Sequence, residues 1–291
     1  MNINWYPGHM ARSLRELGEK LDQVDLVIET CDARLPESSR NPEIRALIER
    51  KPVILVLTKA DLADPDCTAD WLAWYREENV TALEVAIPER SGLGRLVDAI
   101  QKSGEDVVAR ARSRGLQARA IRAMVVGIPN TGKSSLINQL AGRRVARIEN
   151  RPGVTRAPAW VRTSSGITLM DMPGILWPNL GSERQRLILA ASGAIRDDIL
   201  NREEIAFATF CLLRERYPAL LAERFRLTAE ALADNTEDPY VLYEKAARRR
   251  GAVLSGGRID TDRFARLLIT ELRDGRIGRI SLETVSDRAL P

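Results

Sequence analysis

The first part of this chain contains four short runs of apolar residues. They are residues 52–57, 82–87, 121–126 and 167–170. Each is too short for a buried helix and rich in Val, Ile, Leu or Met, which is typical of strands buried on both faces of a parallel sheet. The runs alternate with polar and helical segments, so we predict an α/β domain.

The pattern changes after Ser182. Apolar residues now recur at helical spacing, as in Leu187 and Ala191, and strand-like runs stop. This part should be all-α, with about five helices if each has the mean length of about 11 residues. We therefore predict an α/β domain over residues 1–178 and a helical domain over residues 179–291.

The loop after the third run carries a phosphate-binding motif, the P-loop. Residues 127–134 read Gly-Ile-Pro-Asn-Thr-Gly-Lys-Ser between a predicted strand and a helix start. A glycine-rich turn lets backbone N–H groups point at phosphate oxygens, and the helix N-terminus adds positive charge. Here Lys133 would neutralise the β and γ phosphates and Ser134 would bind Mg²⁺. The predicted phosphate-site residues are Asn130, Thr131, Gly132, Lys133, Ser134 and Ser135.

Two later segments match the switches of a nucleotide hydrolase. Thr155 ends a polar loop at residues 151–155, switch one, where it supplies a second hydroxyl to Mg²⁺ or is simply solvated. Residues 171–174, switch two, follow the fourth apolar run. Asp171 at the end of that strand would hold the metal, and Gly174 would offer its N–H to the γ phosphate.

A base-reading loop lies upstream of the P-loop. Residues 58–61 read Thr-Lys-Ala-Asp. Asp61 can accept from the N1–H and exocyclic amine of guanine while the stem of Lys59 packs over the ring, which favours GTP over ATP. A solvated Lys and Asp at a strand end is the alternative. Asn usually stands where this chain has Thr58, so we expect one tie to the P-loop to be missing. Residues 91–94 are the candidate base-backing loop.

The order of these parts is that of circularly permuted GTPases, in which the base-reading and base-backing loops precede the P-loop and both switches. With further short motifs, the chain resembles the ribosome biogenesis GTPase A (YlqF-type) family over nearly its whole length. The motifs are Asn4-Trp5-Tyr6-Pro7-Gly8-His9-Met10, Asp32-Ala33-Arg34-Leu35-Pro36, Ser39-Arg40-Asn41-Pro42, Tyr243-Glu244-Lys245, Arg249-Arg250-Gly251 and Gly256-Gly257. The resemblance implies a GTPase that helps mature the large ribosomal subunit by binding ribosomal RNA in its GTP form, as a monomer off the ribosome.

Switch two does not supply the residue that orients the attacking water. Many GTPases have a glutamine after the switch-two glycine, but here Ile175 cannot hydrogen-bond. The resemblance implies that His9, the only histidine, takes this role; a structural histidine is the alternative. Asn130 is a second candidate, because in potassium-activated GTPases an asparagine here holds a cation near the phosphoryl group. It can equally cap the loop's own backbone. The candidate catalytic residues are thus His9, Asn130 and Lys133.

Basic charge is concentrated in the tail. The net charge of the chain is only +4, but residues 245–279 contain ten basic and four acidic side chains. Arginine dominates, which favours bidentate phosphate contacts. A solvated helix face is the alternative. The predicted RNA-binding residues are Lys245, Arg248, Arg249 and Arg250. A second basic stretch, residues 110–122, should form a helix that touches RNA or is merely exposed.

Composition favours a soluble, cytoplasmic protein. The chain is 44% hydrophobic over 291 residues, without an apolar run near membrane-spanning length or a signal-peptide pattern. Its three scattered cysteines suit a reducing compartment, the cytosol or an organellar matrix.

Two other functions compete with an RNA-binding assembly GTPase. A P-loop enzyme that phosphorylates a metabolite would need an acceptor-binding element, which we do not find, and would not need the base-reading loop and paired switches. A GTP-regulated protein-binding switch without an RNA role fits the same nucleotide motifs. Salt-dependent RNA binding by the tail would distinguish the assembly factor from such a protein-binding switch.

Overall fold

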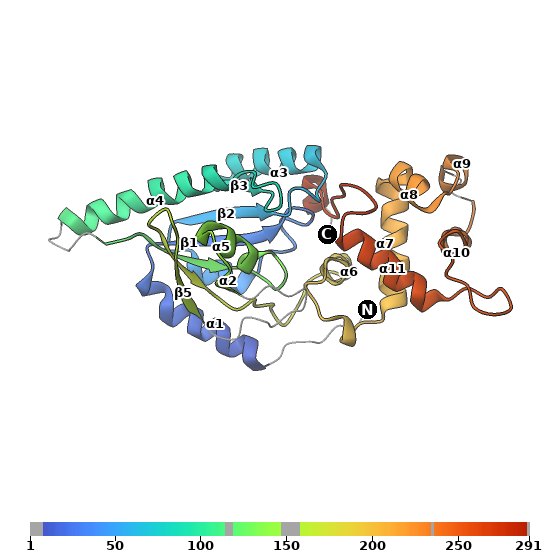
Figure 1. The fold of residues 1–291 in the computed structure, drawn as a ribbon, viewed down its shortest axis with the longest axis horizontal. Helices are drawn as coiled ribbons and strands as arrows, with labels where there is room; N and C mark the ends of the chain where they lie inside the picture. The colour runs from blue at the N-terminus through green and yellow to red at the C-terminus, as the bar shows by residue number, and fades with distance from the viewer. Residues whose placement is uncertain (1–7, 114–118, 147–157, 234–235, 290–291) are drawn as a thin grey trace. The chain divides into compact units, whose positions relative to one another are not determined.

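The computed structural model describes residues 8–113, 119–146, 158–233 and 236–289. Its first part is built around a sheet of six strands, which Figure 1 draws as arrows. The strand order is β3-β2-β1-β4-β6-β5. β5 is antiparallel to β6, and all other neighbouring pairs are parallel. The strands are β1 Leu26–Asp32, β2 Val53–Thr58, β3 Ala82–Val85, β4 Arg122–Val126, β5 Ala159–Arg162 and β6 Thr168–Asp171.

Two strands lie outside the four predicted runs. β1 stands at the centre of the sheet and is buried at all seven positions. Polar residues interrupt its apolar positions, so the sequence does not show a continuous apolar run there. The buried Glu29 of this strand pairs with Arg40 at 2.8 Å. β5 is an edge strand with three of its four residues exposed, so it carries no apolar run.

Helices cover both faces of the sheet. Alternate residues of a strand point to opposite faces, so Val56 of β2 packs into the cluster that includes α4 and α5, whereas Leu57 packs with Trp71 of α3. Asp64 caps α3 through the backbone N–H of Asp66 and Cys67, with Pro65 in the first turn. The helices are α1 Gly8–Lys20, α2 Pro42–Ile48, α3 Pro65–Glu77, α4 Leu93–Ser113 and α5 Lys133–Ala141.

The part of the chain after switch two is helical, as predicted. The described residues after switch two form six α-helices rather than the predicted five, because a short helix, α9, stands between longer neighbours. Aromatic residues build the core: Tyr243 makes edge contacts with Phe210 and Phe264, and Phe225 packs on Phe264. The helices are α6 Glu183–Ser192, α7 Arg202–Arg216, α8 Pro218–Phe225, α9 Ala229–Ala233, α10 Pro239–Arg249 and α11 Thr261–Arg273.

The chain forms two compact units, one of which is Gly181–Leu282. The other contains the sheet, ends at Leu180 and takes in the chain again from Glu283. The prediction that the helical domain continues to residue 291 is therefore wrong at its end. The reason is that residues 283–288 contact α3. Trp71 Nε1 donates to Glu283 O at 3.3 Å, and the Arg288 guanidinium lies 3.6 Å from the Trp74 ring centroid.

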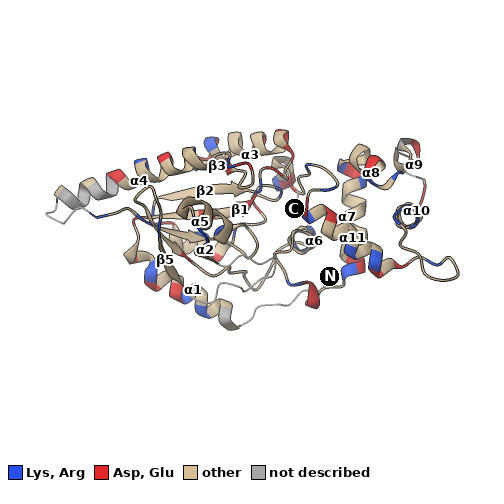
Figure 2. Cartoon of the chain, in the orientation of Figure 1, with Lys and Arg blue, Asp and Glu red and all other residues tan. Residues whose placement is uncertain are grey.

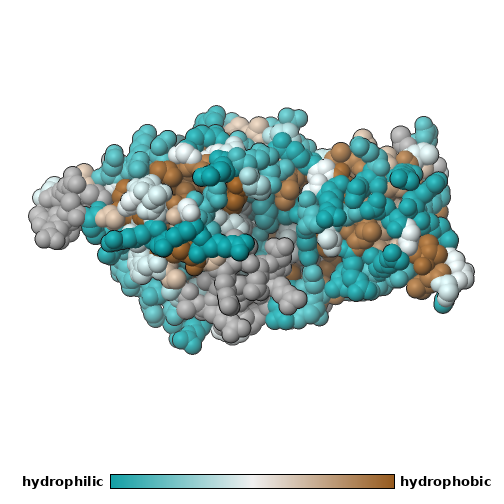
Figure 3. All heavy atoms as spheres, viewed as in Figure 1, coloured by the Kyte–Doolittle hydropathy of each residue, from teal (hydrophilic) through white to brown (hydrophobic). Residues whose placement is uncertain are grey.

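Hydrophilic residues cover most of the visible surface, with apolar residues in separate patches (Figure 3). Exposed apolar side chains include Tyr240 and Val241 of α10 and Leu254 beyond it. Within the described ranges, no helix is long and apolar enough to cross a membrane.

Candidate nucleotide site

The P-loop connects β4 to α5, as the sequence predicts. Gly127 has φ +147°, and a Cβ there would come within 2.5 Å of Thr30 O. Gly132 precedes α5 with φ +82°, and Asn130 also has a positive φ of +60°. The glycines thus allow a tight loop that a side chain would block or strain. Ser134 and Ser135 follow in the first turn of α5.

Lys133 places its ammonium group inside this loop. The residue is 6% exposed, and Nζ donates to Ile128 O at 2.7 Å and Gly127 O at 3.2 Å. Burial lowers the pKa of Lys133 to about 8, although the Asp171 carboxylate opposes the shift. The loop therefore holds a buried cation where a phosphate would bind.

Asp171 lies at the carboxyl end of β6, in register with Val125 of β4. Burial raises the pKa of its carboxyl to about 6, and Lys133 partly offsets the shift. Its Oδ1 is buried and has no hydrogen-bond partner among the described residues. A buried oxygen without a donor fits a hard cation such as Mg²⁺. The described residues hold no cluster of three or more His, Cys, Asp and Glu, so nucleotide phosphates and water would have to complete the ligand set.

Switch two passes close to the P-loop. A Cβ on Gly174 would stand 2.8 Å from Pro129 Cα and 3.1 Å from Lys133 Nζ, so no larger residue fits. The next N–H, of Ile175, donates to Gly127 O at 3.3 Å. The Ile175 side chain is fully buried. It cannot orient a water, as its chemistry already indicated.

The base-reading loop is tied to the P-loop, and the expectation that a tie is missing is wrong. The Thr58 hydroxyl lies 2.6 Å from Thr131 O and 2.9 Å from Cys31 O, so a threonine makes the connection expected of an asparagine. Thr131 is also fixed from β1, because its hydroxyl lies 2.8 Å from that of Thr30. β1 stands between β2 and β4, so Thr131 of the P-loop reaches past the end of β1 to make this bond.

The two charged residues of the base-reading loop have different environments. Lys59 has φ +57°, and its Nζ donates to Asp32 Oδ2 at 2.7 Å. Asp61 Oδ1 is buried and lacks a hydrogen-bond partner within the described ranges. This oxygen is available to a donor such as the edge of a base.

Residues 32–41, the support loop, make contacts that the sequence motifs within them do not predict. Asp32 starts the loop and holds Lys59, while Asn41 ends it and donates from Nδ2 to Ile175 O at 2.9 Å. The loop thus touches both the base-reading loop and the residue after switch two. A signal was present in the sequence, because an Asp-x-Arg segment directly after a β-branched run places two opposite charges at a strand end.

The candidate base-backing loop follows β3. Ser91 pairs with Ala86 in an isolated β-bridge, and Gly92 has φ +80°. A Cβ on Gly92 would come within 2.2 Å of Glu84 O, so the turn requires glycine. Since β3 neighbours β2, this turn and the base-reading loop follow adjacent strands.

Two predicted groups lie outside the described residues. Thr155 and the rest of switch one belong to the range 147–157, and of His9 only the backbone, in the first turn of α1, is described. The segment leading into switch one is fixed by Asn138 of α5. Its Oδ1 accepts from the N–H groups of Val145 at 2.8 Å and Ala146 at 2.7 Å.

Figure 2 shows basic positions in blue on α10. The four predicted RNA-binding residues differ in their surroundings. Arg248 and Arg249 are exposed, and Arg248 donates to Gly257 O at 2.8 Å. Lys245 pairs with Glu237. Arg250 instead shares the buried carboxylate of Glu271 with a second arginine, Arg224 of α8, whose Nε lies 2.9 Å from Oε2. Arg250 therefore joins helices within the unit.

In the second basic stretch, residues 110–122, two arginines have partners. Arg119 binds Asp25 at 2.6 Å, and the Arg122 guanidinium lies 5.5 Å from the Trp160 ring centroid. These two cations have partners in the sheet unit. The prediction of a helix over the whole stretch is wrong at its end, since residues 119–121 are not helical and Arg122 begins β4.

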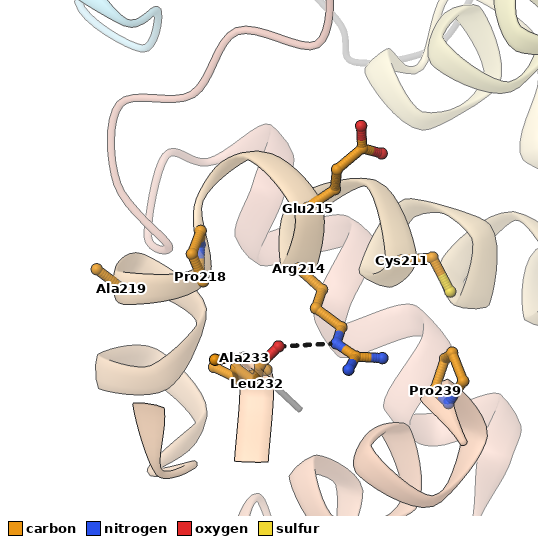
Figure 4. A pocket seen from close by; sticks show the side chains of 8 residues that line it. All are labelled: Cys211, Arg214, Glu215, Pro218, Ala219, Leu232, Ala233 and Pro239. Carbon is orange, nitrogen blue, oxygen red and sulfur yellow. Dashed lines mark hydrogen bonds between the residues drawn. The ribbon is translucent and has the colours of Figure 1, made fainter. Parts of the chain in front are cut away.

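A separate pocket of about 660 Å³ lies within the helical unit, between α7, α8 and the start of α10 (Figure 4). Cys211, Leu232 and Pro239 contribute to its walls, and Arg214 Nε donates across it to Leu232 O at 3.0 Å. Among the residues that the structure describes, no predicted nucleotide-site residue lines it.

Comparison with known proteins places these features in context. A family model described as 50S ribosome-binding GTPase matches residues 122–213. Ribosome biogenesis GTPase A of Priestia megaterium is 40% identical over 292 aligned positions, which span 100% of both chains. The protein of the same name from Bacillus pumilus is 39% identical over 97% of this chain and 99% of its own.

Solved structures are similar as well. A GDP-bound structure of TM YlqF has a TM-score of 0.64 and 26% identity, over 94% of this chain and 100% of the other. A GNP-bound YlqF from T. maritima has a TM-score of 0.63 and 26% identity, over 94% and 98%.

Proposed function

Because the chain belongs to the ribosome biogenesis GTPase A family and is a GTPase, we propose that it assists assembly of the large ribosomal subunit. In this proposal the GTP form of the protein binds ribosomal RNA, and GTP hydrolysis releases the protein from the RNA. The observation that carries the proposal is the 40% identity over the full length of a protein named for ribosome biogenesis. The bond from Thr58 to Thr131 O adds that the base-reading loop and the P-loop are joined, as a nucleotide site requires. The proposed site of action is the cytoplasm.

The nucleotide would be held at both ends. Backbone N–H groups of residues 130–135 and the Lys133 ammonium would bind the phosphates, while Asp61 accepts from guanine and Lys59 covers the ring. Support comes from the buried cation in the P-loop and from Asp61 Oδ1, which is buried without a hydrogen-bond partner among the described residues. Gly174 is close enough to Lys133 to offer its N–H to the γ phosphate.

Mg²⁺ would be held by Asp171, Ser134 and, from switch one, Thr155. When bound, it neutralises charge on the β and γ phosphates. Asp171 fits this role because its Oδ1 is buried without a donor. K⁺ is a second proposed cofactor, held by Asn130, where a cation adds positive charge beside the transferring phosphoryl group.

The water-orienting group is proposed to be His9. Ile175 is excluded by its chemistry and its burial. The imidazole can accept a proton or a hydrogen bond from the attacking water. The backbone of His9 belongs to α1, an element of the sheet unit.

RNA would bind Lys245, Arg248 and Arg249, the exposed cations of α10. Two adjacent arginines at the last turn of a helix can each make bidentate contacts to phosphate. Arg250 contributes less in this view, since Glu271 neutralises it.

The test is sedimentation with purified large ribosomal subunits in the presence of GDP or a non-hydrolysable GTP analogue. We expect co-sedimentation with the analogue, loss with GDP, and a steep decrease with salt. Equal behaviour in both nucleotides would contradict a nucleotide-dependent assembly factor. Binding to a ribosomal protein but not to RNA would instead favour a protein-binding switch.

A further inference from the structure

A buried ion pair stands beside the base-reading loop. Asp32 and Arg34, at the carboxyl end of β1, are each 2% exposed. Arg34 Nε donates to Asp32 Oδ1 at 2.9 Å and Nη2 to Oδ2 at 2.8 Å. This bidentate geometry fixes both side chains.

The pair extends to the base-reading loop. Asp32 Oδ2 also accepts from Lys59 Nζ at 2.7 Å, so one carboxylate binds two cations. Arg34 in turn interacts electrostatically with Asp61, whose charge helps raise the Arg34 pKa against the effect of burial. Two acids and two bases thus form one neutral cluster in which Asp61 is the member with an unpartnered oxygen within the described residues.

We propose that Asp32 and Arg34 are positioning residues for guanine recognition: Asp32 holds Arg34 and Lys59, and thereby leaves the Asp61 carboxylate available to the base. This inference rests on the proposed role of Asp61 as base reader. Neither Asp32 nor Arg34 needs to touch the nucleotide.

The charges explain why Asp32 is needed. A buried guanidinium without a carboxylate is costly, and removal of one partner of a buried ion pair forces the other to find a new one. Asp61 is a second acid whose charge acts on Arg34. Without the Asp32 charge, Arg34 would bind Asp61 and compete with guanine for it, while Lys59 would lose the contact that fixes its stem.

The support loop offers a matched control. Arg40 and Glu29 form another buried ion pair, 8% and 1% exposed, with Nη2 to Oε2 at 2.8 Å. Arg40 also lies near Glu37 and over the Tyr75 ring, and none of these described contacts reaches the base-reading loop. Changing it should cost stability without changing base selectivity.

The experiment compares the affinities of GDP and inosine diphosphate by calorimetry, using the full chain with Mg²⁺. Inosine lacks the exocyclic amine, so the ratio of the two dissociation constants reports one hydrogen bond to Asp61. A hydrogen bond to a charged group corresponds to a ratio of roughly 10- to 100-fold. The variants are Asp61→Ala, Asp32→Asn, Arg34→Lys and, as control, Arg40→Lys.

We expect Asp61→Ala to bring the ratio of the two dissociation constants close to one and Asp32→Asn to lower it nearly as far. The control Arg40→Lys should keep the parent ratio even if its melting temperature falls. If Asp32→Asn does not fold, Arg34→Lys decides, because its single ammonium cannot bridge Asp32 bidentately and the ratio should again fall. A parental ratio in a folded Asp32→Asn or Arg34→Lys protein, beside a collapsed ratio in Asp61→Ala, would overturn this inference alone. A parental ratio in Asp61→Ala would overturn the base reader itself.

Discussion

The hydroxyl of Thr58 lies 2.6 Å from the carbonyl oxygen of Thr131, so the loop that reads the base and the loop that binds the phosphates share a hydrogen bond. Both residues are buried, at 0% and 1% exposed. A buried hydrogen bond of this kind keeps the two ends of the nucleotide site at a fixed separation.

Removal of this hydroxyl should weaken nucleotide binding. Thr58→Val keeps the shape but leaves Thr131 O without this donor. Since a typical hydrogen bond contributes about 0.5–1.5 kcal/mol, GDP affinity should fall roughly 2- to 10-fold by calorimetry. Thr58→Ser, which keeps the hydroxyl, should stay near the parent. Equal affinities in Thr58→Val and parent would show that the bond does not shape the site.

His9→Ala should lower the turnover number while GTP affinity stays near the parent value. This pattern marks an interaction made mainly in the transition state. Losing a water-orienting group costs roughly 10²- to 10⁴-fold. The decisive measurement is single-turnover hydrolysis with saturating large subunit. Identical rates for parent and variant would make His9 structural.

GTP hydrolysis should be faster in potassium than in sodium at equal ionic strength. A cation held by Asn130 adds positive charge where negative charge develops. The difference should disappear in Asn130→Ala. If the parent protein hydrolyses GTP equally fast in both salts, Asn130 serves only to cap the loop.

Replacing Arg248 and Arg249 by alanine should weaken RNA binding. Each lost phosphate contact removes about one unit from the slope of log affinity against log salt. The matched control is Arg250→Ala, which leaves buried Glu271 with one arginine fewer. It should lower the melting temperature, at a cost of about 1–3 kcal/mol, and change the slope little. The reverse assignment, a flatter slope only in Arg250→Ala, would contradict this division.

Glu283 should make the stability of the sheet unit depend on pH. Burial raises the pKa of its carboxyl to about 7, although the Ser38 N–H at 2.9 Å opposes the shift. The unfolded carboxyl has a lower pKa and binds fewer protons between about pH 4.5 and 7. The contribution of Glu283 to stability is therefore greatest below this range and decreases as pH rises through it, by up to about 3 kcal/mol.

Glu283→Gln should flatten this profile and raise the melting temperature above pH 7. Asp171, whose pKa is raised to about 6, titrates in the same range with the same sign, so the difference between parent and variant is the quantity to measure. Parallel profiles would show that Glu283 is not responsible.

The sequence alone predicted much of this protein. The spacing of Gly127, Gly132 and Lys133, the runs of β2, β3, β4 and β6 and the helical second part are all found in the structure, and the resemblance to the ribosome biogenesis GTPase A family is confirmed. These features depend on residue type over a short window, because strand burial, phosphate binding and helix periodicity are local properties.

Only the tertiary structure decided which buried polar groups are partners. It showed that Thr58 replaces the asparagine tie, that Asp32 holds Lys59, that Arg250 binds Glu271, and that the chain returns to the sheet unit at Glu283. The physical reason is that a buried charge or donor must find a partner wherever the fold brings one. Glu283 accepts from Ser38, 245 positions earlier in the chain, and no local pattern records such a pair.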